Sequence, residues 1–564
     1  MKESKNFIEN IIDEDLSLGF NKGLLKFRFP PEPNGFLHIG HVKAIWVNFS
    51  LAKKYSSPVV LRFDDTNPEK EEQKYIDSIK EDVSWLGYSW SEERYASDYF
   101  DQLHLWAKEL INKNLAYVDS QSSEKIAKQK GTPTSPGINS PFRKRTVKEN
   151  QLLFEKMTSG VFNEGEHVLR AKIDMSSANM LMRDPVIYRV LKKPHPRTKN
   201  EWCVYPMYDW AHGQSDYIEQ ISHSLCTLEF KPHRELYDWF LDSLVQNNKV
   251  RPKQREFARL NLSHTITSKR KLMFLVKNGI VSGWDDPRMP TISGLRRRGY
   301  PPTALKEFVR LAGVAKRENI IEASLLEFCA REELNKSSNR VMVVTNPLKL
   351  TITNYPDDKQ ELVFSENNPE NPSSGGREIP FGKDIYIEQE DFKAEANRKF
   401  FRLTIGKEVR LKSAYIIKAT SVVYNKDNSI KEVLCTYDPK SRSGSGTEES
   451  QRKVKGTLHW VSKKTAIKVQ VNQYDRLFEH PNPADAQSEE ELLSMINPNS
   501  STTCFAYAEP SLSKAQVGQK FQFQRLGYFV VDNNTSSNIV FNKTVGLRDN
   551  WKNNLFVSFF FFFS

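Results

Sequence analysis

The chain changes character near residue 338, and this change is the sequence feature that most limits its possible folds. Before that point, strand-like and helix-like segments alternate: residues 24–29 and 58–63 suit buried strands, and residues 38–53 between them have helical spacing. After it, short segments rich in β-branched and aromatic residues are separated by turn residues. The pattern predicts an α/β half that begins with a βαβ unit, followed by an all-β half of one or two barrels.

The α/β half is not continuous in this prediction. Helices are expected at residues 69–86 and 99–115, and helical patterns dominate residues 234–335. Residues 120–165 are rich in Lys, Ser, Gly and Pro, which indicates an insertion with exposed basic loops. Strand character returns at residues 201–208, so the alternation of strands and helices is expected to resume there.

Composition narrows the class of protein. A chain of 564 residues exceeds what one hydrophobic core usually organises, so several domains are expected. The formal net charge of +12 and the pI near 9.1 are typical of proteins that bind phosphate groups, although a merely basic surface fits them equally. The longest apolar runs fall far short of the roughly 20 residues that span a bilayer, so no membrane partner is expected.

Cysteine usage and the N-terminus indicate a compartment. The 5 cysteines form no C-x-x-C pair, which argues against a zinc ribbon or a disulfide framework, and no metal site is expected. The first residues, MKESKNFIENIIDEDL, have neither the apolar core of a secretory signal nor the composition of a transit peptide. The expected location is the cytoplasm.

The strongest local signal is PPEPNGFLHIGHVKA, residues 30–44, which follows a predicted strand and opens a predicted helix. The prolines and Gly35 indicate a tight turn, after which the helix start offers unpaired N–H groups and a positive dipole end to phosphates. His38 and His41 share one helix face, where imidazoles can donate hydrogen bonds to a phosphate as charge builds up. Gly40 between them leaves room for a nucleotide ring or phosphate. A bare pair of histidines is more often a satisfied surface or core pair, so the whole string carries the interpretation.

This string resembles the HIGH motif of class I aminoacyl-tRNA synthetases, and its longer form PEPNGFLHIGH is similar to that of the glutaminyl branch. The resemblance implies that His38 and His41 are catalytic. The residues of this segment that it assigns to ATP binding are Glu32, Pro33, Asn34, His38, Ile39, Gly40, His41, Val42, Lys43 and Ala44. Thr227, Arg259 and Leu260 are similar to the family's adenosine-contacting set.

A second motif is expected on a loop farther along the chain, because the phosphates need mobile cations from the opposite side. The segment Ile266-Thr267-Ser268-Lys269-Arg270 resembles the KMSKS loop of the same family, which places Thr267, Ser268 and Lys269 at ATP and makes Lys269 catalytic. Alone, such a basic triplet is usually a solvated surface. Thr267 stands where methionine is common, a difference that concerns the packing of the loop.

An amino-acid site needs a carboxylate for the ammonium group, a cation for the carboxylate and neutral polar groups for a side-chain amide. By resemblance, Asp64, Arg28 and Tyr208 do these jobs, although the Asp-Asp-Thr-Asn-Pro run would otherwise be interpreted as a turn. His212 and Gln254 are expected to complete the pocket.

The choice between glutamine and glutamate depends on charge. Glutamyl relatives usually carry an arginine at the position of Cys226, where it can pair with a γ-carboxylate. A small neutral cysteine fits an amide better, so the resemblance implies L-glutamine as the substrate.

The resemblance covers nearly the whole chain to about residue 549 and extends to tRNA. Five cations are similar in position to family residues that contact the anticodon region, although each can equally be an ordinary surface cation: Lys316, Arg340, Arg402, Lys412 and Arg525. Pro232 stands where glutaminyl enzymes often carry an aspartate that reads the acceptor stem, and proline has no such side-chain group. Acceptor-stem discrimination is therefore expected to differ here.

The resemblance implies a two-step reaction, in which L-glutamine is activated by ATP to glutaminyl-adenylate and is then transferred to the 3′ end of tRNA(Gln). It implies Mg²⁺ with the ATP, activation that waits for tRNA, and a monomer. Three alternatives stay open: a barrel-type glutamyl relative, a small nucleotidylyltransferase that would leave the β-rich half without a role, and a non-catalytic tRNA-binding paralogue.

The expected domains follow from the same resemblance. They are the first half of a Rossmann-like catalytic domain (1–100), an acceptor-stem-binding insertion (101–205), the second half of the catalytic domain (206–262), a helical connector with the KMSKS-like loop (263–338), two β-barrels that bind the anticodon (339–550) and a disordered tail (551–564) that contains the phenylalanine run Phe559 to Phe563.

Overall fold

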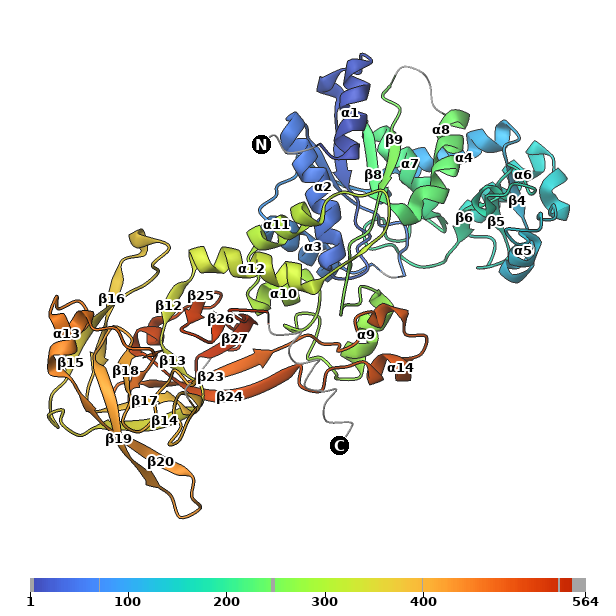
Figure 1. The fold of residues 1–564 in the computed structure, drawn as a ribbon. Helices are drawn as coiled ribbons and strands as arrows, with labels where there is room; N and C mark the ends of the chain where they lie inside the picture. The colour runs from blue at the N-terminus through green and yellow to red at the C-terminus, as the bar shows by residue number, and fades with distance from the viewer. Residues whose placement is uncertain (1–4, 70, 245–248, 398, 536–537, 550–564) are drawn as a thin grey trace. The chain divides into compact units, whose positions relative to one another are not determined.

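The computed structural model describes residues 5–69, 71–244, 249–397, 399–535 and 538–549 (Figure 1). The chain divides into two compact units, one made of residues 1–261 and 309–321 and the other of residues 262–308 and 322–564. The expected disordered tail, residues 551–564, lies outside the described residues. No described helix combines the length and the apolar character that a membrane span requires.

The first unit is built on parallel strands. β1 (Phe27–Phe29), β2 (Val59–Phe63) and β3 (Glu92–Tyr95) pair in parallel in that order, and the central strand β2 is buried along its whole length. β8 (His223–Thr227) and β9 (Lys253–Phe257) form a second parallel pair. The backbone N–H of Ser222 donates to the carbonyl of Lys26 at 3.0 Å, so β8 begins beside the start of β1. The spatial order is therefore β3-β2-β1-β8-β9, and it reverses between β1 and β8.

Helices connect these strands and cover them. The described helices of this part are α1 (Phe7–Ser17), α2 (Ile39–Tyr55), α3 (Gln73–Trp85), α4 (Phe100–Asn112), α7 (Tyr208–Ile218) and α8 (Arg234–Leu244). α2 joins β1 to β2, which confirms the predicted βαβ unit. It ends at Ser56, which adopts a left-handed conformation with φ of 58° and whose N–H binds carbonyls of the last turn.

An antiparallel sheet interrupts the parallel scheme between β3 and β8. Its strands, in spatial order, are β4 (Ala116–Asp119), β5 (Val168–Ala171), β6 (Val186–Val190) and β7 (Val204–Pro206). The segment 120–165, expected to consist of loops, also contains α5 (Ser123–Gln129) and α6 (Val147–Thr158). α6 begins with a capping box in which Thr146 and Glu149 bind each other's backbone N–H groups. This is a helix-start signal that the basic composition of the segment obscures.

The second unit contains two sheets of seven strands each among its described residues. The first is ordered β21 (Thr457–Leu458), β18 (Glu408–Leu411), β19 (Ile416–Tyr424), β20 (Ile430–Tyr437), β14 (Pro347–Ile352), β17 (Asp384–Glu388), β22 (Val461–Ser462). The second is ordered β12 (Asn339–Val341), β25 (Lys520–Phe523), β26 (Gly527–Val531), β27 (Val540–Val545), β23 (Ile467–Tyr474), β24 (Ser501–Ala508), β13 (Val343–Val344). Separate apolar cores fill the two sheets, one around Trp460 and one around Phe523.

The remaining elements are shorter. The strands are β10 (Asn261–Leu262), β11 (Ile320–Ile321) and the hairpin β15 (Glu361–Glu366) with β16 (Gly376–Phe381). The helices are α9 (Lys269–Lys277), α10 (Ile292–Arg298), α11 (Pro302–Ala312), α12 (Ala323–Ser337), α13 (Glu448–Gln451) and α14 (Glu489–Ser494).

The predicted all-β half is confirmed, and several boundaries in the α/β half are wrong. The first strand begins at Phe27 instead of residue 24, and the helix expected from residue 69 begins at Gln73. The strand expected at 201–208 ends at Pro206, because Tyr208 opens α7. The helical interpretation of residues 234–335 missed β9, because its five residues include a single apolar one, Phe257, and so give no strand pattern.

Candidate active site

The predicted site residues of the first unit gather where the parallel strands end. The histidine motif follows β1, Asp64 follows β2, Thr227 ends β8 and Arg259 comes just after β9. In open parallel sheets, ligands bind outside the carboxyl ends of the strands at the point where the strand order reverses. That point lies between β1 and β8, so the general rule predicts a ligand site beside the histidine motif.

The two histidines cap the helix that they begin. His38 is the N-cap of α2, and its Nδ1 accepts a hydrogen bond from the Gly40 N–H at 3.1 Å. The Nδ1 of His41 accepts one from the His38 N–H, also at 3.1 Å. Because a neutral imidazole has one acceptor and one donor nitrogen, both rings carry their proton on Nε2. The backbone therefore fixes the tautomer of both side chains and leaves each Nε2–H to donate elsewhere.

Both histidines are neutral at physiological pH. Burial lowers the pKa of His41 to about 4, and burial together with the neighbouring His41 lowers the pKa of His38 well below its usual value. The ring centroids lie 4.0 Å apart. Two neutral N–H donors side by side at a helix N-terminus form a site suited to an anionic phosphate.

Gly40 is required by its neighbour His38. A Cβ added at Gly40 would lie 2.9 Å from Cε1 and 3.0 Å from Nδ1 of the His38 ring. The expectation that Gly40 leaves room for a nucleotide therefore has a second physical reason within the protein itself. The same added atom would lie 4.0 Å from the carbonyl oxygen of Leu260, so this predicted adenosine contact is close to the motif.

The other predicted ATP contacts around the motif divide into two kinds. Ile39 and Val42 are completely buried, so their side chains belong to the core and leave only backbone groups for a ligand. Lys43 is buried as well, which lowers the pKa of its ammonium to about 8. Glu32 is exposed, whereas Pro33 is buried, and Asn34 and Ala44 are half-buried.

Asp64 is a buried carboxylate with the properties of a cation site. Its backbone N–H donates to the Pro31 carbonyl at 3.0 Å, and its Oδ1 accepts a hydrogen bond from the Thr66 hydroxyl at 3.1 Å. Among the described residues, no Lys, Arg or His forms an ion pair with it. Burial raises the pKa of Asp64 to about 7 although the nearby positive charge of Arg62 opposes the rise, and the charge of Glu32 contributes to it. A substrate ammonium would supply the missing positive charge.

Arg28 lies beneath the site in a buried network of charges. It is completely buried, and its Nε donates to Asp216 at 3.1 Å while Nη1 donates to the Leu225 carbonyl at 2.7 Å. Arg62 binds the same Asp216 carboxylate at 2.8 Å and Glu219 at 2.9 Å. The two arginines hold the pKa of Asp216 far below its usual range despite burial. The predicted role of Arg28 at the substrate carboxylate stays a prediction, since its donors are occupied here.

His212 and Tyr208 cover this network from α7. The two rings stack with centroids 5.1 Å apart, and Nε2 of His212 lies 3.2 Å from Nη2 of Arg28. Burial lowers the pKa of His212 to about 3, so its ring is neutral. Burial also raises the pKa of Tyr208 well above its usual value, and the charge of Asp64 acts in the same direction. Tyr208 therefore stays a neutral hydroxyl near the predicted ammonium site.

Cys226 and Gln254 are neutral residues of the predicted amino-acid site. Burial raises the pKa of the Cys226 thiol to about 12, which keeps it uncharged. Gln254 is buried, and its amide donates to the Phe230 carbonyl at 2.9 Å and to Glu256 at 3.0 Å. Glu256 is in turn paired with Arg234. The positive charge of Arg234 is therefore already neutralised within the protein.

The predicted adenosine contacts Thr227 and Arg259 share one acidic neighbour. Glu229 accepts a hydrogen bond from the Thr227 hydroxyl at 2.7 Å and pairs with Arg259 at 3.2 Å. Arg259 also binds Glu318 at 3.1 Å. Pro232, noted for its lack of a side-chain polar group, accepts a hydrogen bond at its carbonyl from Asn179 at 2.9 Å.

The KMSKS-like motif lies in the second unit and is only partly a loop. Ile266 is buried, Thr267 is half-buried, and Ser268 and Lys269 are exposed. Lys269 is the first residue of α9, which corrects the expectation that the whole motif is a loop. The apolar side chains Ile266, Leu272 and Leu275 fix this turn against a core that includes Leu477. The segment is therefore packed against a core although Thr267 stands where methionine is common.

The predicted tRNA contacts are divided between the units. Lys316 belongs to the first, where its Nζ lies 5.0 Å from the centre of the Phe7 ring. Arg402 and Arg525 meet in the second unit: Arg525 binds both oxygens of Asp391, and Arg402 Nε lies 3.4 Å from the same carboxylate. These two arginines also line one hollow of about 690 Å³ together with Phe400 and Phe401.

The other two predicted tRNA contacts lie in different surroundings. Lys412 is exposed and lines a hollow of about 700 Å³ with Arg410, Arg442 and Gln524. Arg340 is half-buried in β12, and its Nη2 donates to Asn335 at 3.1 Å. Lys412 therefore has room for a base beside it, whereas Arg340 is held by the protein.

Sequence reasoning missed the residues that hold the site together. Asp216, Arg62 and Glu219 touch or surround the predicted contacts but carry no motif of their own. One signal was available: Asp216 follows His212 by one helical turn, so both must share a face of α7. Asp65, Glu71 and His195 also cluster close to Asp64 and were not singled out.

Comparison with known proteins gives matches along most of the chain. Residues 25–336 match the model for the catalytic domain of class I tRNA synthetases (E and Q). Residues 338–438 and 457–532 match two models for the anti-codon binding domain of class I tRNA synthetases (E and Q). The first match includes every predicted residue of the ATP and amino-acid sites.

Relatives and solved structures are also similar to this chain. Two curated proteins, the glutamine–tRNA ligases of Salmonella typhimurium (strain LT2) and Salmonella newport (strain SL254), are each 53% identical over 549 residues, 97% of this chain and 98% of theirs. A crystal structure of a glutamate tRNA ligase from Elizabethkingia meningosepticum is 19% identical, with a TM-score of 0.42 over 56% of this chain and 70% of that one.

Proposed function

The chain belongs to the class I tRNA synthetases of the glutamate and glutamine group, and we propose that it is a glutamine–tRNA ligase. It activates L-glutamine with ATP and transfers the glutamine to the 3′ end of tRNA(Gln). Relatives of nearly the same length that bear this name support the assignment. The predicted anticodon-binding region accounts for the β-rich half, which a small nucleotidylyltransferase would leave without a role.

The reaction has two steps. In the first, an oxygen of the glutamine α-carboxylate attacks the α-phosphorus of ATP, and the bond from that phosphorus to the bridging oxygen breaks, so pyrophosphate leaves with the electron pair. In the second, a terminal ribose hydroxyl of tRNA attacks the carbonyl carbon of the adenylate, and AMP leaves. No protein side chain becomes covalently attached, so positioning and phosphate electrostatics supply the rate.

The observation that best supports this chemistry is the arrangement of His38 and His41, whose side chains cap the start of α2. Their Nδ1 atoms are occupied by backbone N–H groups, so each ring presents a neutral Nε2–H donor without any rearrangement. A donor that is already oriented costs no reorganisation when negative charge builds up on the α-phosphate. Lys269 is proposed to add a positive charge from the second motif.

Preference for glutamine over glutamate is supported by the charges near Cys226. The thiol is neutral, Arg28 is bound to Asp216, and Arg234 is bound to Glu256. A γ-carboxylate entering this pocket would lose its hydration without gaining an unpaired cation, whereas a neutral amide would lose much less. Asp64 is proposed to bind the ammonium group, and Tyr208 the polar groups beside it.

Three further points belong to the proposal. Mg²⁺ is expected to accompany ATP, and it would neutralise phosphate charge when bound. The protein is proposed to act as a monomer in the cytoplasm. Activation is proposed to wait for tRNA, as the family resemblance implies.

The test is aminoacylation of a total tRNA pool with ATP and either labelled glutamine or labelled glutamate, alongside pyrophosphate exchange with and without tRNA. Charging by glutamine alone, with exchange only when tRNA is present, is the expected result. Charging by glutamate would move the assignment to the glutamyl relative. Binding of tRNA without charging would leave a non-catalytic paralogue.

A further inference from the structure

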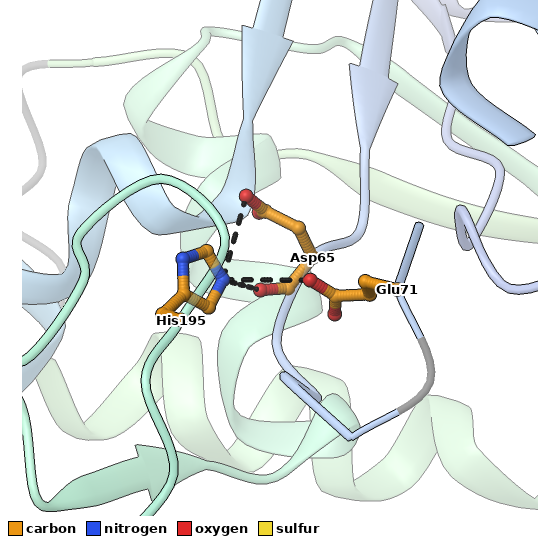
Figure 2. Close-up of side chains that lie close together, drawn as sticks. All are labelled: Asp65, Glu71 and His195. Atoms are coloured by element: carbon orange, nitrogen blue, oxygen red, sulfur yellow. Dashed lines mark hydrogen bonds and ion pairs between the residues drawn. The ribbon is translucent and has the colours of Figure 1, made fainter. Parts of the chain in front are cut away.

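Three buried side chains outside the predicted site residues come together next to Asp64 (Figure 2). The exposed fractions of His195, Asp65 and Glu71 are 1%, 2% and 8%. The Nε2 atom of His195 lies 2.7 Å from the main-chain oxygen of Asp65, 3.4 Å from Oε2 of Glu71 and 3.7 Å from Oδ2 of Asp65. One ring nitrogen therefore faces three oxygens.

The hydrogen bonds of the ring show that the cluster holds a proton and does not suit a metal ion. Nδ1 of His195 accepts from the backbone N–H groups of Arg197 at 3.1 Å and Thr198 at 3.2 Å, so Nδ1 carries no proton. The proton of a neutral imidazole is then on Nε2, where it is donated to the Asp65 carbonyl. A metal would need a lone pair on Nε2, which this tautomer does not have.

The contact joins two segments that are far apart in the sequence. His195 comes from the connection between β6 and β7 of the insertion, and Asp65 follows the end of β2. Two more insertion residues bind the same turn: Arg189 donates to the Asn67 side chain at 3.0 Å, and Lys193 pairs with Glu69 at 2.6 Å. Residues 64–69, 71 and 72, here called the Asp64 turn, are thus held from the side of the insertion.

The Asp64 turn is held from the other side by the segment that precedes the histidine motif. The Asp64 N–H donates to the Pro31 carbonyl at 3.0 Å, and the Glu72 N–H donates to the Pro33 carbonyl at 3.3 Å. Within the turn, Oε1 of Glu71 accepts from the Asn67 N–H at 2.7 Å, while Oε2 has no hydrogen-bond partner among the described residues. The buried Nε2 of His195 lies 3.4 Å from this oxygen.

We propose that His195 is a positioning residue of the amino-acid site: by donating to the Asp65 carbonyl, it fixes the Asp64 turn and so the place of the Asp64 carboxylate. The proposal rests on the proposed function, in which Asp64 binds the ammonium group of glutamine. His195 does not contact the substrate itself. Its effect on the reaction passes through the peptide unit that directly follows Asp64.

Two substitutions separate this role from a general role in folding. In His195→Gln, the side-chain amide reaches the place of Nε2, so the donor to Asp65 is kept and the acceptor for Arg197 and Thr198 is lost. In His195→Asn, the amide oxygen takes the place of Nδ1, so the acceptor is kept and the donor is lost. A role confined to shaping the loop after His195 predicts greater harm from His195→Gln, whereas positioning of Asp64 predicts greater harm from His195→Asn.

The measurements are steady-state aminoacylation at saturating tRNA and hydrogen–deuterium exchange of the full chain. For His195→Asn, we expect the KM for glutamine to rise about tenfold while the KM for ATP stays within about twofold, because one buried hydrogen bond that orients the carboxylate is lost. Amides of the Asp64 turn should exchange faster. His195→Gln should match the wild type in the KM for glutamine and in the exchange of this segment.

A matched control is His167→Asn, which changes a histidine of the insertion that contacts Ser120 and not the Asp64 turn. It should leave both measurements unchanged. Equal KM values for glutamine in wild type and His195→Asn, or greater harm from His195→Gln, would overturn the positioning role. A wild type that charges no glutamine would overturn the proposed function, and the exchange measurement would still decide whether His195 fixes the turn.

Discussion

At the scale of single residues, local surroundings set the protonation of the side chains that are proposed to act. His38 and His41 each accept a backbone N–H at Nδ1, so both present Nε2–H as neutral donors. Asp64 has the opposite character: it is a buried carboxylate without an ion-pair partner among the described residues, and its pKa is raised to about 7. Both properties depend on the surroundings of the residue and not on its identity.

The capping role of His38 can be separated from its chemical role. His38→Asn keeps a side-chain acceptor for the Gly40 N–H, and asparagine is a favoured N-cap residue, so the melting temperature should change little. The Nε2–H donor is lost, so kcat should fall by about 100-fold or more. Aminoacylation kinetics together with thermal denaturation check this. A large fall in melting temperature would mean that the loss of activity reports on folding.

Glutamine binding should depend on pH through Asp64. The carboxylate must be ionised to bind an ammonium group, so affinity should be highest above its pKa of about 7. Below that value, the KM for glutamine should rise by about tenfold per pH unit as the carboxylate becomes protonated. The pKa values of His41 and Cys226, about 4 and 12, lie outside this window. The check is the KM for glutamine between about pH 5.5 and 7.5.

The effect of Asp64 on folding has the opposite sign. Its pKa is higher in the folded chain than in the unfolded chain, so ionisation favours the unfolded state, and its contribution to stability weakens as pH rises from about 4 towards 7. Asp64→Asn should therefore not destabilise the protein at neutral pH, and it should abolish the pH dependence of the KM. A pH profile that survives this substitution would assign the titration to another group.

At the scale of elements, one buried carboxylate joins strands and helix. Asp216 on α7 binds Arg28 of β1 and Arg62 of β2 and accepts a hydrogen bond from Ser224 of β8 at 2.7 Å. Each of these elements carries or precedes a predicted substrate contact. The ion pairs fix the relative positions of the elements, which hydrophobic packing alone would determine less strictly.

Removing this carboxylate should destabilise the first unit strongly. Asp216→Asn would leave two buried arginines without their shared anion, and breaking a buried pair in this way costs about 3–5 kcal/mol. Asp101→Asn, which changes an exposed acid in the first turn of α4, should cost less than about 1 kcal/mol. Denaturant unfolding followed by circular dichroism measures both. Equal midpoints for the two variants would contradict this role of Asp216.

The pH dependence of this contribution follows from the direction of the pKa shift. The pKa of Asp216 lies far below its value in an unfolded chain, so its stabilising effect is fully present above about pH 4 and is lost only as pH falls further. The difference in unfolding free energy between wild type and Asp216→Asn should therefore be constant from about pH 5 to 8.

At the scale of the whole molecule, the chain divides its tasks between two units. The first carries the histidine motif and the predicted amino-acid site, and the second carries the KMSKS-like motif and most of the predicted tRNA contacts. The net charge of +12 suits the recognition of a long polyanion. A substitution in the second unit that disturbs only predicted tRNA contacts should therefore change the KM for tRNA and leave the KM values for glutamine and ATP unchanged.

Asp391 is suited to such a substitution, because it holds both Arg402 and Arg525. Asp391→Asn should weaken both contacts, and the KM for tRNA should rise about tenfold while kcat at saturating tRNA stays within about twofold. Asp438→Asn is the control, since Asp438 pairs with Arg452 at an exposed site and should have little effect. Aminoacylation at varied tRNA concentration checks both, and equal KM values would remove Asp391 from tRNA binding.

The sequence by itself determined the fold class, and it predicted most residues of the candidate site. Hydrophobic periodicity and turn residues indicated β1, α2, β2 and the all-β half, because these signals are local and strong. The motif at His38 and His41 predicted a phosphate site, since its glycine and histidines are residue types that suit phosphate binding. β9 and the helices inside 120–165 were missed, because short segments with few apolar residues give weak patterns.

Only the tertiary structure decided how distant segments share tasks. β12 and β13 precede the first seven-stranded sheet in the sequence but pair with the last strands of the chain, so that sheet is inserted within the second one. Asp216 likewise forms ion pairs with arginines of β1 and β2, and His195 of the insertion binds the residue after Asp64. Such contacts depend on chain topology and on burial, and a local pattern of residues contains neither.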